Sequence, residues 1–219
     1  MAEIIRVDGV QFSHGDKPVL RDVSFTVTAG EAVVLLGASG VGKSTLLKLL
    51  AGLLQPLAGT VAVEEAASGV GSRMVFQEPR LFPWMSVRNN VYFALRSTGI
   101  PESEWPDRVS ALLDQVGLID ELDALPSALS IGMAQRVALV RALACQPSVL
   151  LLDEPFSALD PKRRAQLRKD LTRLVAFTGV SVVMVTHDID EALEIGDQVL
   201  VLDGQPAQVV SALRPAAMD

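Results

Sequence analysis

The chain has 219 residues, of which 49% are apolar, and it carries a formal net charge of −7. This length and apolar content suffice for one large domain with a sizeable core. The acidic balance argues against a nucleic-acid-binding protein, which would need a basic face, and the single cysteine excludes a disulfide framework and fits a reducing compartment.

The start of the chain shows no secretory signal, because residues 1–6 carry charges where a signal would have its apolar core. The longest apolar runs are far too short to cross a bilayer. We therefore expect any work at a membrane to proceed through a partner.

Strands are predicted in the first part of the chain, those at 10–12 and 23–27 from the alternation of apolar and polar residues. Five are expected, at residues 10–12, 23–27, 32–36, 59–63 and 72–76. The apolar run Ala32–Leu36 is a buried strand by this criterion, since it lacks the alternation of a half-exposed one.

A glycine-rich segment follows that buried strand directly and reads Gly37-Ala38-Ser39-Gly40-Val41-Gly42-Lys43-Ser44-Thr45. Its glycines let consecutive backbone N–H groups turn toward phosphate oxygens, Lys43 adds a positive charge, and Ser44 offers a hydroxyl to Mg²⁺. A helix over 45–51 would direct its positive dipole end at the same phosphates. A chance glycine-rich turn is the weaker interpretation, because a strand precedes this segment and a helix follows it.

The pattern changes near Glu78, where helical spacing of apolar residues begins and prolines punctuate the chain. Helices are expected at 87–96, 104–116 and 131–144. Ser103 or Asp107 is the candidate cap of the second helix, and Ser130 of the third. This predicts a helical insert, about 78–145, within a core formed by 1–77 and 146–210.

Alternation of strands and helices resumes after the insert, with strands at 149–152, 180–185 and 198–202 and helices at 161–176 and 188–194. Buried strands alternating with helices predict a parallel sheet covered on both faces, hence an α/β fold. Residues 211–219 are expected to form a short, loosely held tail.

Two carboxylates, Asp153 and Glu154, follow the buried run 149–152. The carboxyl ends of parallel strands are where such sheets bind ligands. One carboxylate suits a divalent ion on a nucleotide, and its neighbour suits deprotonation of a water aimed at the γ-phosphate. A solvated acidic turn is the alternative.

Further segments follow the phosphate loop in a fixed order: Gln77 at a strand end, Leu129-Ser130-Ile131-Gly132-Met133-Ala134-Gln135-Arg136, Leu152-Asp153-Glu154-Pro155, Ser157-Ala158-Leu159-Asp160 and Thr186-His187-Asp188. With the loop, this set resembles the ATP-binding subunit of an ABC transporter over about residues 4–210. The resemblance implies a P-loop NTPase core with a mainly parallel sheet, an N-terminal antiparallel part and an inserted α-helical subdomain.

The resemblance also implies roles for the matching positions. Glu154 corresponds to the catalytic base, His187 to the switch histidine at the γ-phosphate, and Gln77 to the glutamine that touches Mg²⁺ or water and reports to the transporter. ATP contacts are implied for Gly37, Ala38, Ser39, Gly40, Val41, Gly42, Lys43, Ser44, Thr45, His14, Ser130, Gly132 and Asp160, and Mg²⁺ contacts for Ser44, Gln77 and Asp153. A lone histidine is more often a capping or core residue, but the place of His187 directly after a buried strand favours the site.

Ile131 is a departure from the family pattern, which places glycine between Ser130 and the next glycine. A β-branched residue tolerates positive φ poorly and is bulkier near a nucleotide. Either this position has an ordinary φ and Ile131 points away, or ATP-driven closure is weakened. We expect the substitution Ile131→Gly to raise the ATPase rate.

His14 is a second departure, because the family usually has an aromatic residue at this position, just before Gly15. An imidazole can stack on adenine but offers less area than a tyrosine ring. Phe12 lies two residues earlier and is the alternative platform, or part of the core.

The resemblance implies that two such subunits, in a homodimer, sandwich two ATP molecules and drive transmembrane permease subunits from the cytoplasmic face of the inner membrane. The segment 77–87, rich in Phe, Trp and Met, is a candidate docking surface, or else fills the core of the helical lobe. The sequences around Pro83-Trp84 and in 186–192 resemble those of importers of the nitrate, sulfonate and taurine group. This resemblance implies a solute-binding protein as a further partner.

Three rival functions stay open. The same ATPase could serve an exporter or a lipid-moving system, or be a soluble relative that remodels another macromolecule. A P-loop kinase would leave 130–132 and the neighbouring Asp153 and Glu154 unexplained.

Overall fold

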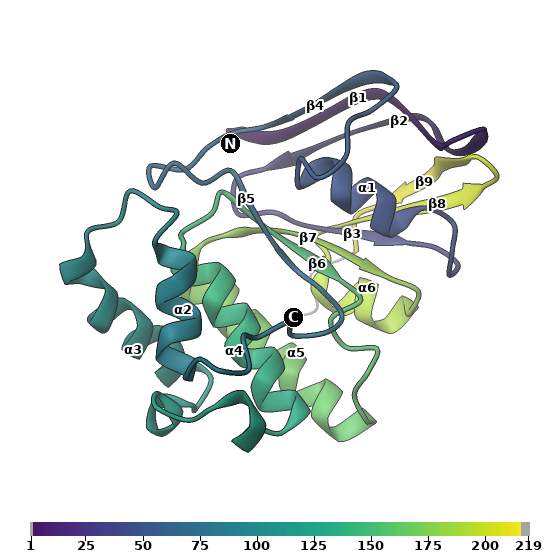
Figure 1. Ribbon diagram of the computed structural model, residues 1–219. Helices are drawn as coiled ribbons and strands as arrows, with labels where there is room; N and C mark the ends of the chain where they lie inside the picture. Colours follow the sequence, from purple (N-terminus) through teal and green to yellow (C-terminus); the bar gives the residue numbers. More distant parts are fainter. Residues whose placement is uncertain (1, 216–219) are drawn as a thin grey trace. The chain divides into compact units, whose positions relative to one another are not determined.

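The computed structural model describes residues 2–215, which form two compact units (Figure 1). The first comprises the chain up to Glu64, the short segment 151–154 and the chain from Ser181 onward; the second comprises Glu65–Leu150 and Pro155–Val180. The second unit therefore begins earlier than the insert expected at 78–145. It also includes 155–180, because the helix in that segment packs against helices of the insert.

The first unit is built on a sheet of seven strands in the order β4-β1-β2-β9-β8-β3-β7, beside which β6 contributes its last residues. The strands are β1 Glu3–His14, β2 Lys17–Thr28, β3 Ala32–Leu36, β4 Ala58–Val63, β6 Val149–Asp153, β7 Ser181–Thr186, β8 Gln198–Gly204 and β9 Ala207–Leu213. β1 pairs antiparallel with β2 and β4, whereas β3 pairs parallel with β7 and β8.

Two helices complete this unit, α1 Lys43–Leu50 and α6 Ile189–Ile195. α1 packs on β4 and β7, while α6 packs on β3 and β7 on the other side of the parallel strands (Figure 1). β7 is buried along its whole length, since both faces of these central strands are covered. The parallel arrangement places the ends of β3, β6 and β7 at one edge of the sheet.

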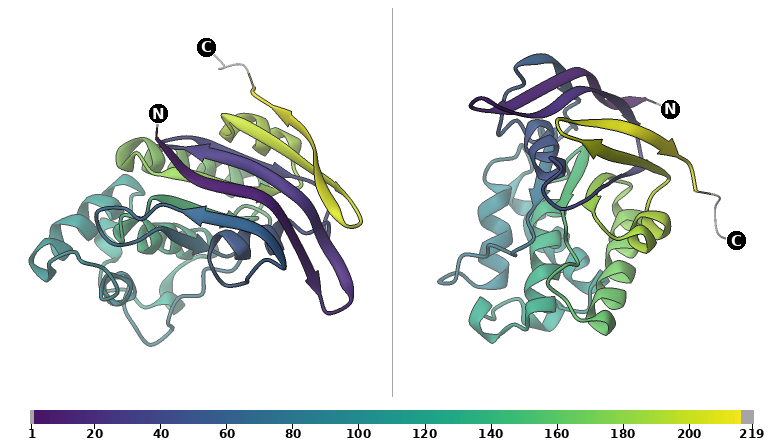
Figure 2. Two further views of the ribbon diagram at one scale, coloured as in Figure 1. Left: turned by 90° about the horizontal axis from the view of Figure 1, so that it is seen from above. Right: turned by 90° about the vertical axis from the view of Figure 1, so that its right-hand side faces the viewer.

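Strand β9 lies in a part of the chain for which no strand was expected, and the last three of its residues fall in the expected tail 211–219. It pairs antiparallel with β8 and meets β2 at the register Leu20 opposite Ala207. The β1–β2 and β8–β9 hairpins consequently lie side by side (Figure 2). Residues 216–219 of that tail are outside the described residues.

The second unit contains strand β5 Ser72–Val75, the start of β6 and most of the helices. They are α2 Val87–Leu95, η1 Glu102–Glu104, α3 Trp105–Gln115, η2 Ile119–Glu121, η3 Pro126–Ala128, α4 Ile131–Ala144 and α5 Pro161–Thr178. α4 is the central helix, since it packs against α2, α3, α5 and β5. None of the helices among residues 2–215 combines the length and apolarity needed to cross a membrane.

Helix caps in this unit match the sequence only in part. Ser130 caps α4 by accepting a hydrogen bond from the Met133 N–H, as predicted. The predicted caps Ser103 and Asp107 are wrong, because α3 begins after Glu104 without any side-chain cap. The buried Trp105 anchors that helix start instead, donating from Nε1 to the Ile100 carbonyl at 3.0 Å.

Candidate functional site

The glycine-rich loop joins β3 to α1 at the edge of the sheet where the parallel strands end. Gly40 and Gly42 have φ values of 80° and 118°, which only glycine adopts without strain. Gly37 is required for a different reason, because a Cβ there would lie 2.6 Å from the Leu202 carbonyl oxygen. The glycine spacing therefore reflects both backbone conformation and the close approach of β8.

Lys43, the first residue of α1, extends back into the curve of the loop and is only 4% exposed. Its Nζ donates to the carbonyl oxygens of Gly37 at 2.7 Å and Ala38 at 3.0 Å. Burial lowers the pKa of this ammonium, an effect opposed by the nearby carboxylates of Glu154 and Asp153. The loop thus holds one desolvated positive charge at its centre.

The two carboxylates that follow β6 have different partners. Asp153 Oδ1 accepts a hydrogen bond of 2.8 Å from Ser44 Oγ. Glu154 Oε1 lies 3.7 Å from Lys43 Nζ, and its Oε2 lies 3.3 Å from His187 Nδ1. Glu154 also has a φ of 44°, unusual for a residue with a side chain, while its N–H is held by the Val185 carbonyl. Strain of this kind is typical of a functional position.

His187 follows β7 directly and is 53% exposed, so it is not a core residue. It is not the cap of α6 either, since Asp188 accepts the hydrogen bonds from the N–H groups of Asp190 and Glu191. Thr186 fixes this turn by donating to Glu191 Oε2 at 2.6 Å. The geometry therefore favours the site interpretation of His187, as a neighbour of Glu154.

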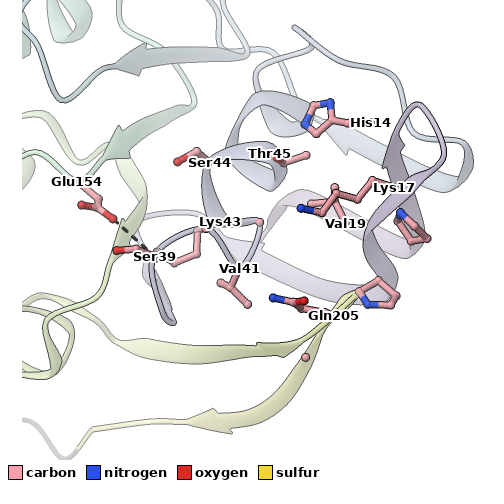
Figure 3. A pocket seen from close by; sticks show the side chains of 15 residues that line it. His14, Lys17, Val19, Ser39, Val41, Lys43, Ser44, Thr45, Glu154 and Gln205 are labelled. Atoms are coloured by element: carbon pink, nitrogen blue, oxygen red, sulfur yellow. Dashed lines mark ion pairs between the residues drawn. The ribbon is translucent and has the colours of Figure 1, made fainter.

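A cavity of about 510 Å³ opens over the loop in the first unit (Figure 3). It is lined by His14, Lys17, Pro18, Val19, Ser39, Gly40, Val41, Gly42, Lys43, Ser44, Thr45, Glu154, Gly204, Gln205 and Pro206. His14 lines the cavity with an exposed ring, whereas Phe12 is buried and meets the His14 ring edge-on at 4.9 Å between centroids. Phe12 is therefore a core residue, and His14 is the one accessible to a ligand.

Sequence reasoning missed the part of this cavity formed by Lys17, Val19 and Gln205. These residues lie near the β1–β2 turn and in the turn before β9, which the paired hairpins bring to the loop. The sequence signals were the break at residues 15–18 between the first two strands and the Gly204-Gln205-Pro206 turn followed by a short apolar run.

The remaining predicted residues belong to the second unit. Ser130, Gly132 and Asp160 line a separate cavity of about 480 Å³. Arg136, Lys162, Arg163, Gln166 and Leu167 complete its lining. Asp160 caps α5 by accepting from the Arg163 N–H, so the first turns of α4 and α5 face the same space. Gln77 is an exposed residue of this unit, two positions after β5.

Ile131 is the first residue of α4 and does not have a positive φ. Its side chain is 57% exposed. The structure thus supports the first alternative, an ordinary backbone with the side chain directed away. Because Ile131 has an ordinary φ, backbone strain gives no reason to expect a higher ATPase rate in Ile131→Gly.

The site combines a phosphate loop that holds a buried lysine with two consecutive acidic residues, Asp153 and Glu154, at the end of β6. This combination defines a P-loop nucleotide hydrolase. The model of the ABC transporter family matches residues 20–157. The chain is 50% identical over 214 residues to the aliphatic sulfonates import ATP-binding protein SsuB 1 of Xanthomonas axonopodis pv. citri (96% of this chain, 84% of the relative). It is 44% identical over 199 residues to the nitrate import ATP-binding protein NrtD of Synechocystis sp. (90% and 75%).

Two solved structures share the fold. One is cbiO1 of Clostridium perfringens, part of the ABC transporter complex cbiONQ, with a TM-score of 0.86 at 30% identity (98% of this chain, 90% of that chain). The other is an ATP-binding subunit of an ABC transporter, with a TM-score of 0.82 at 26% identity (96% and 90%).

The chain belongs to the ABC transporter family, as an ATP-binding subunit that hydrolyses ATP and acts with a membrane complex. The predicted family, α/β fold and ATPase activity are confirmed.

Proposed function

We propose that this chain is the ATPase subunit of an importer for small anions of the sulfonate or nitrate kind. The support is the 50% identity, over 96% of the chain, to a subunit named for aliphatic sulfonate import, together with 44% identity to one named for nitrate import. An exporter or a soluble ATPase has no comparable support among these relatives.

The observation that carries the hydrolytic mechanism is the position of Glu154 between Lys43 and His187. In the proposed mechanism the loop binds the phosphates of ATP, and Lys43 Nζ exchanges its two carbonyl partners for phosphate oxygens. Glu154 accepts the proton of the attacking water. His187 donates from Nδ1 and so positions the Glu154 carboxylate, and its proposed place is beside the γ-phosphate.

Mg²⁺ fits the pair formed by Ser44 and Asp153, because a hydroxyl and a carboxylate 2.8 Å apart are oxygen ligands of the kind this ion takes beside phosphates and water. We propose that Ser44 and Asp153 hold the ion, while a Mg²⁺ contact of Gln77 rests on the resemblance alone. Its chemistry when bound is to neutralise charge on the β- and γ-phosphates.

We further propose that the subunit works as a homodimer on the cytoplasmic face of the inner membrane. Ser130, Gly132 and Asp160 gather in the second unit around a cavity with cationic residues. Helix N-termini favour phosphate, so this group is suited to the γ-phosphate of ATP held by the loop of the other subunit.

The permease surface is proposed to lie on the aromatic cluster Phe82, Trp84 and Phe93, which we call the aromatic patch. The Phe82 ring contacts both of the others, at centroid distances of 5.7 Å and 4.8 Å. Trp84 is 71% exposed, so it does not fill the core of its own unit. Exposed aromatic clusters of this kind are favoured at protein interfaces.

Capture of the tagged subunit from detergent-solubilised host membranes, followed by mass spectrometry, tests the proposal. We expect a polytopic permease and a solute-binding protein with the wild-type chain, and loss of the permease with Trp84→Ala but not with the exposed Leu57→Ala. Cells deleted for this gene should regain uptake of labelled alkanesulfonate or nitrate with the wild-type chain and not with Glu154→Gln. Recovery of soluble partners alone would overturn the importer in favour of a non-transport ATPase.

A further inference from the structure

The segment that follows β5 is held by side chains of α4 on both sides of Gln77. Gln135, which is buried, donates from Nε2 to the Phe76 carbonyl at 3.3 Å. Arg141 donates to two successive carbonyls, from Nη2 to Pro79 at 2.9 Å and from Nη1 to Arg80 at 2.8 Å. The backbone from 76 to 80 is thus attached to one helix at three carbonyl groups.

The turn that Arg141 holds is strained. Arg80 has a φ of 47°, in the left-handed region that a residue with a side chain seldom occupies. Its guanidinium lies 3.8 Å from the centroid of the Phe76 ring, so the turn also closes on itself. Backbone strain of this kind persists only where neighbouring contacts enforce it, and the paired bonds from Arg141 supply such contacts.

Asn90 of α2 continues the attachment along the chain. It is fully buried, accepts from the Phe82 N–H at 2.8 Å and donates from Nδ2 to the carbonyls of Phe82, Met85 and Ser86. The aromatic patch therefore sits on a backbone whose polar groups are bound by buried side chains.

We propose that Arg141 is a positioning residue that couples the aromatic patch to α4, the helix whose first turn carries Ser130 and Gly132. The fork of Arg141 fixes the Pro79–Arg80 turn, so movement of the patch is passed to the ATP-facing end of the same helix. Only arginine offers two donors in one plane at this spacing, so a lysine can replace one bond and not the pair. The inference rests on the proposed permease surface, and one of its tests is independent of it.

The independent test measures the segment itself in the isolated subunit. We compare Arg141→Met, Arg141→Lys and a matched control, Arg88→Met, which removes an arginine of α2 that pairs with the exposed Asp123. Hydrogen–deuterium exchange of the peptide spanning 77–86 should rise about tenfold in Arg141→Met, less in Arg141→Lys, and not in the control. Trp84 fluorescence anisotropy, measured with Trp105→Phe in all proteins, should fall in the same order.

The functional test uses the purified complex with its permease. We measure the ratio of solute-stimulated to basal ATP hydrolysis, which should fall about fivefold or more in Arg141→Met and partly recover in Arg141→Lys. ATP affinity of the isolated subunit should be unchanged, because the phosphate loop belongs to the other unit. A purely structural role would lower both rates together and leave the ratio as in wild type.

Two results would overturn the inference: an unchanged exchange rate in Arg141→Met, or faster exchange with an unchanged ratio. If Arg141→Met fails to fold, Arg141→Lys alone decides, with the same two outcomes. If the wild-type complex itself shows no stimulation by solute, the proposed function fails, and the exchange data still test the role of Arg141 in the turn.

Discussion

Ser44 on α1 and Asp153 at the end of β6 are joined by a hydrogen bond of 2.8 Å, although 109 residues separate them in the chain. The bond exists because β3 and β6 end at the same edge of the sheet and the loop after β3 turns α1 back over that edge. It places a hydroxyl and a carboxylate together at the site where the phosphates are expected. Both oxygens are ligands that Mg²⁺ accepts.

Asp153→Asn should therefore weaken the binding of Mg²⁺ and slow hydrolysis without unfolding the protein. The amide keeps an oxygen that can accept from Ser44 but loses the negative charge that attracts the ion. We expect the rate at saturating ATP to fall by roughly two orders of magnitude and the half-saturating Mg²⁺ concentration to rise. Phosphate release measured across a Mg²⁺ titration checks this, with the exposed Asp123→Asn as control. Full activity of wild type in excess chelator would contradict the metal assignment.

Glu154→Gln should separate ATP binding from hydrolysis. The amide cannot accept the proton of the attacking water, whereas the loop that binds the phosphates is untouched. Loss of a general base typically lowers the rate by a factor of about 10² to 10⁴. Single-turnover hydrolysis and binding of a fluorescent ATP analogue, measured side by side, give the two quantities. The exposed Glu64→Gln should behave as wild type, and a Glu154→Gln enzyme retaining more than about a tenth of the rate would exclude Glu154 as the base.

The phosphate loop was predictable because all of its functional residues lie in one segment of nine consecutive residues, with a strand before it and a helix after it. The Glu154–His187 contact needed β6 and β7 to be neighbours in the sheet, which alternating strands and helices made foreseeable only in outline. Strand β9 was missed because it is largely exposed and joined to β8 by a tight turn, so it lacks a buried periodic run. The cavity residues that it carries were missed with it.

The start of α3 illustrates a different limit of local sequence signals. Ser103 and Asp107 have the side chains that cap helices, yet neither does so. The buried indole of Trp105 and its bond to the Ile100 carbonyl fix the helix start instead. Burial of a large aromatic side chain outweighs a cap worth about 1 kcal/mol, and that burial cannot be read from neighbouring residues.

Lys43→Met should weaken nucleotide binding while leaving the nucleotide-free fold nearly as stable. Burial lowers the pKa of Lys43, so the folded state disfavours the ammonium relative to the unfolded chain. Removing the ammonium group therefore lowers the free energy of unfolding only a little at neutral pH. We expect ATP affinity to fall at least about tenfold and the free energy of unfolding to change by less than about 1 kcal/mol. Urea denaturation with and without ATP measures both quantities. If the free energy of unfolding without ATP fell by several times that amount, the bonds from Lys43 to Gly37 and Ala38 would be structural.

Ile131→Gly should leave the ATPase rate within about twofold of wild type at saturating ATP. Ile131 begins α4 with ordinary backbone geometry and an exposed side chain, so glycine relieves no strain there. The expected cost is in the helix, up to about 1 kcal/mol of stability from the freedom of glycine in the unfolded chain. Steady-state hydrolysis and thermal denaturation of Ile131→Gly and Ile131→Ala distinguish the two effects, since alanine removes the bulk and keeps the helix propensity. Faster hydrolysis in both variants would mean that the isoleucine side chain obstructs closure of the ATP-bound dimer.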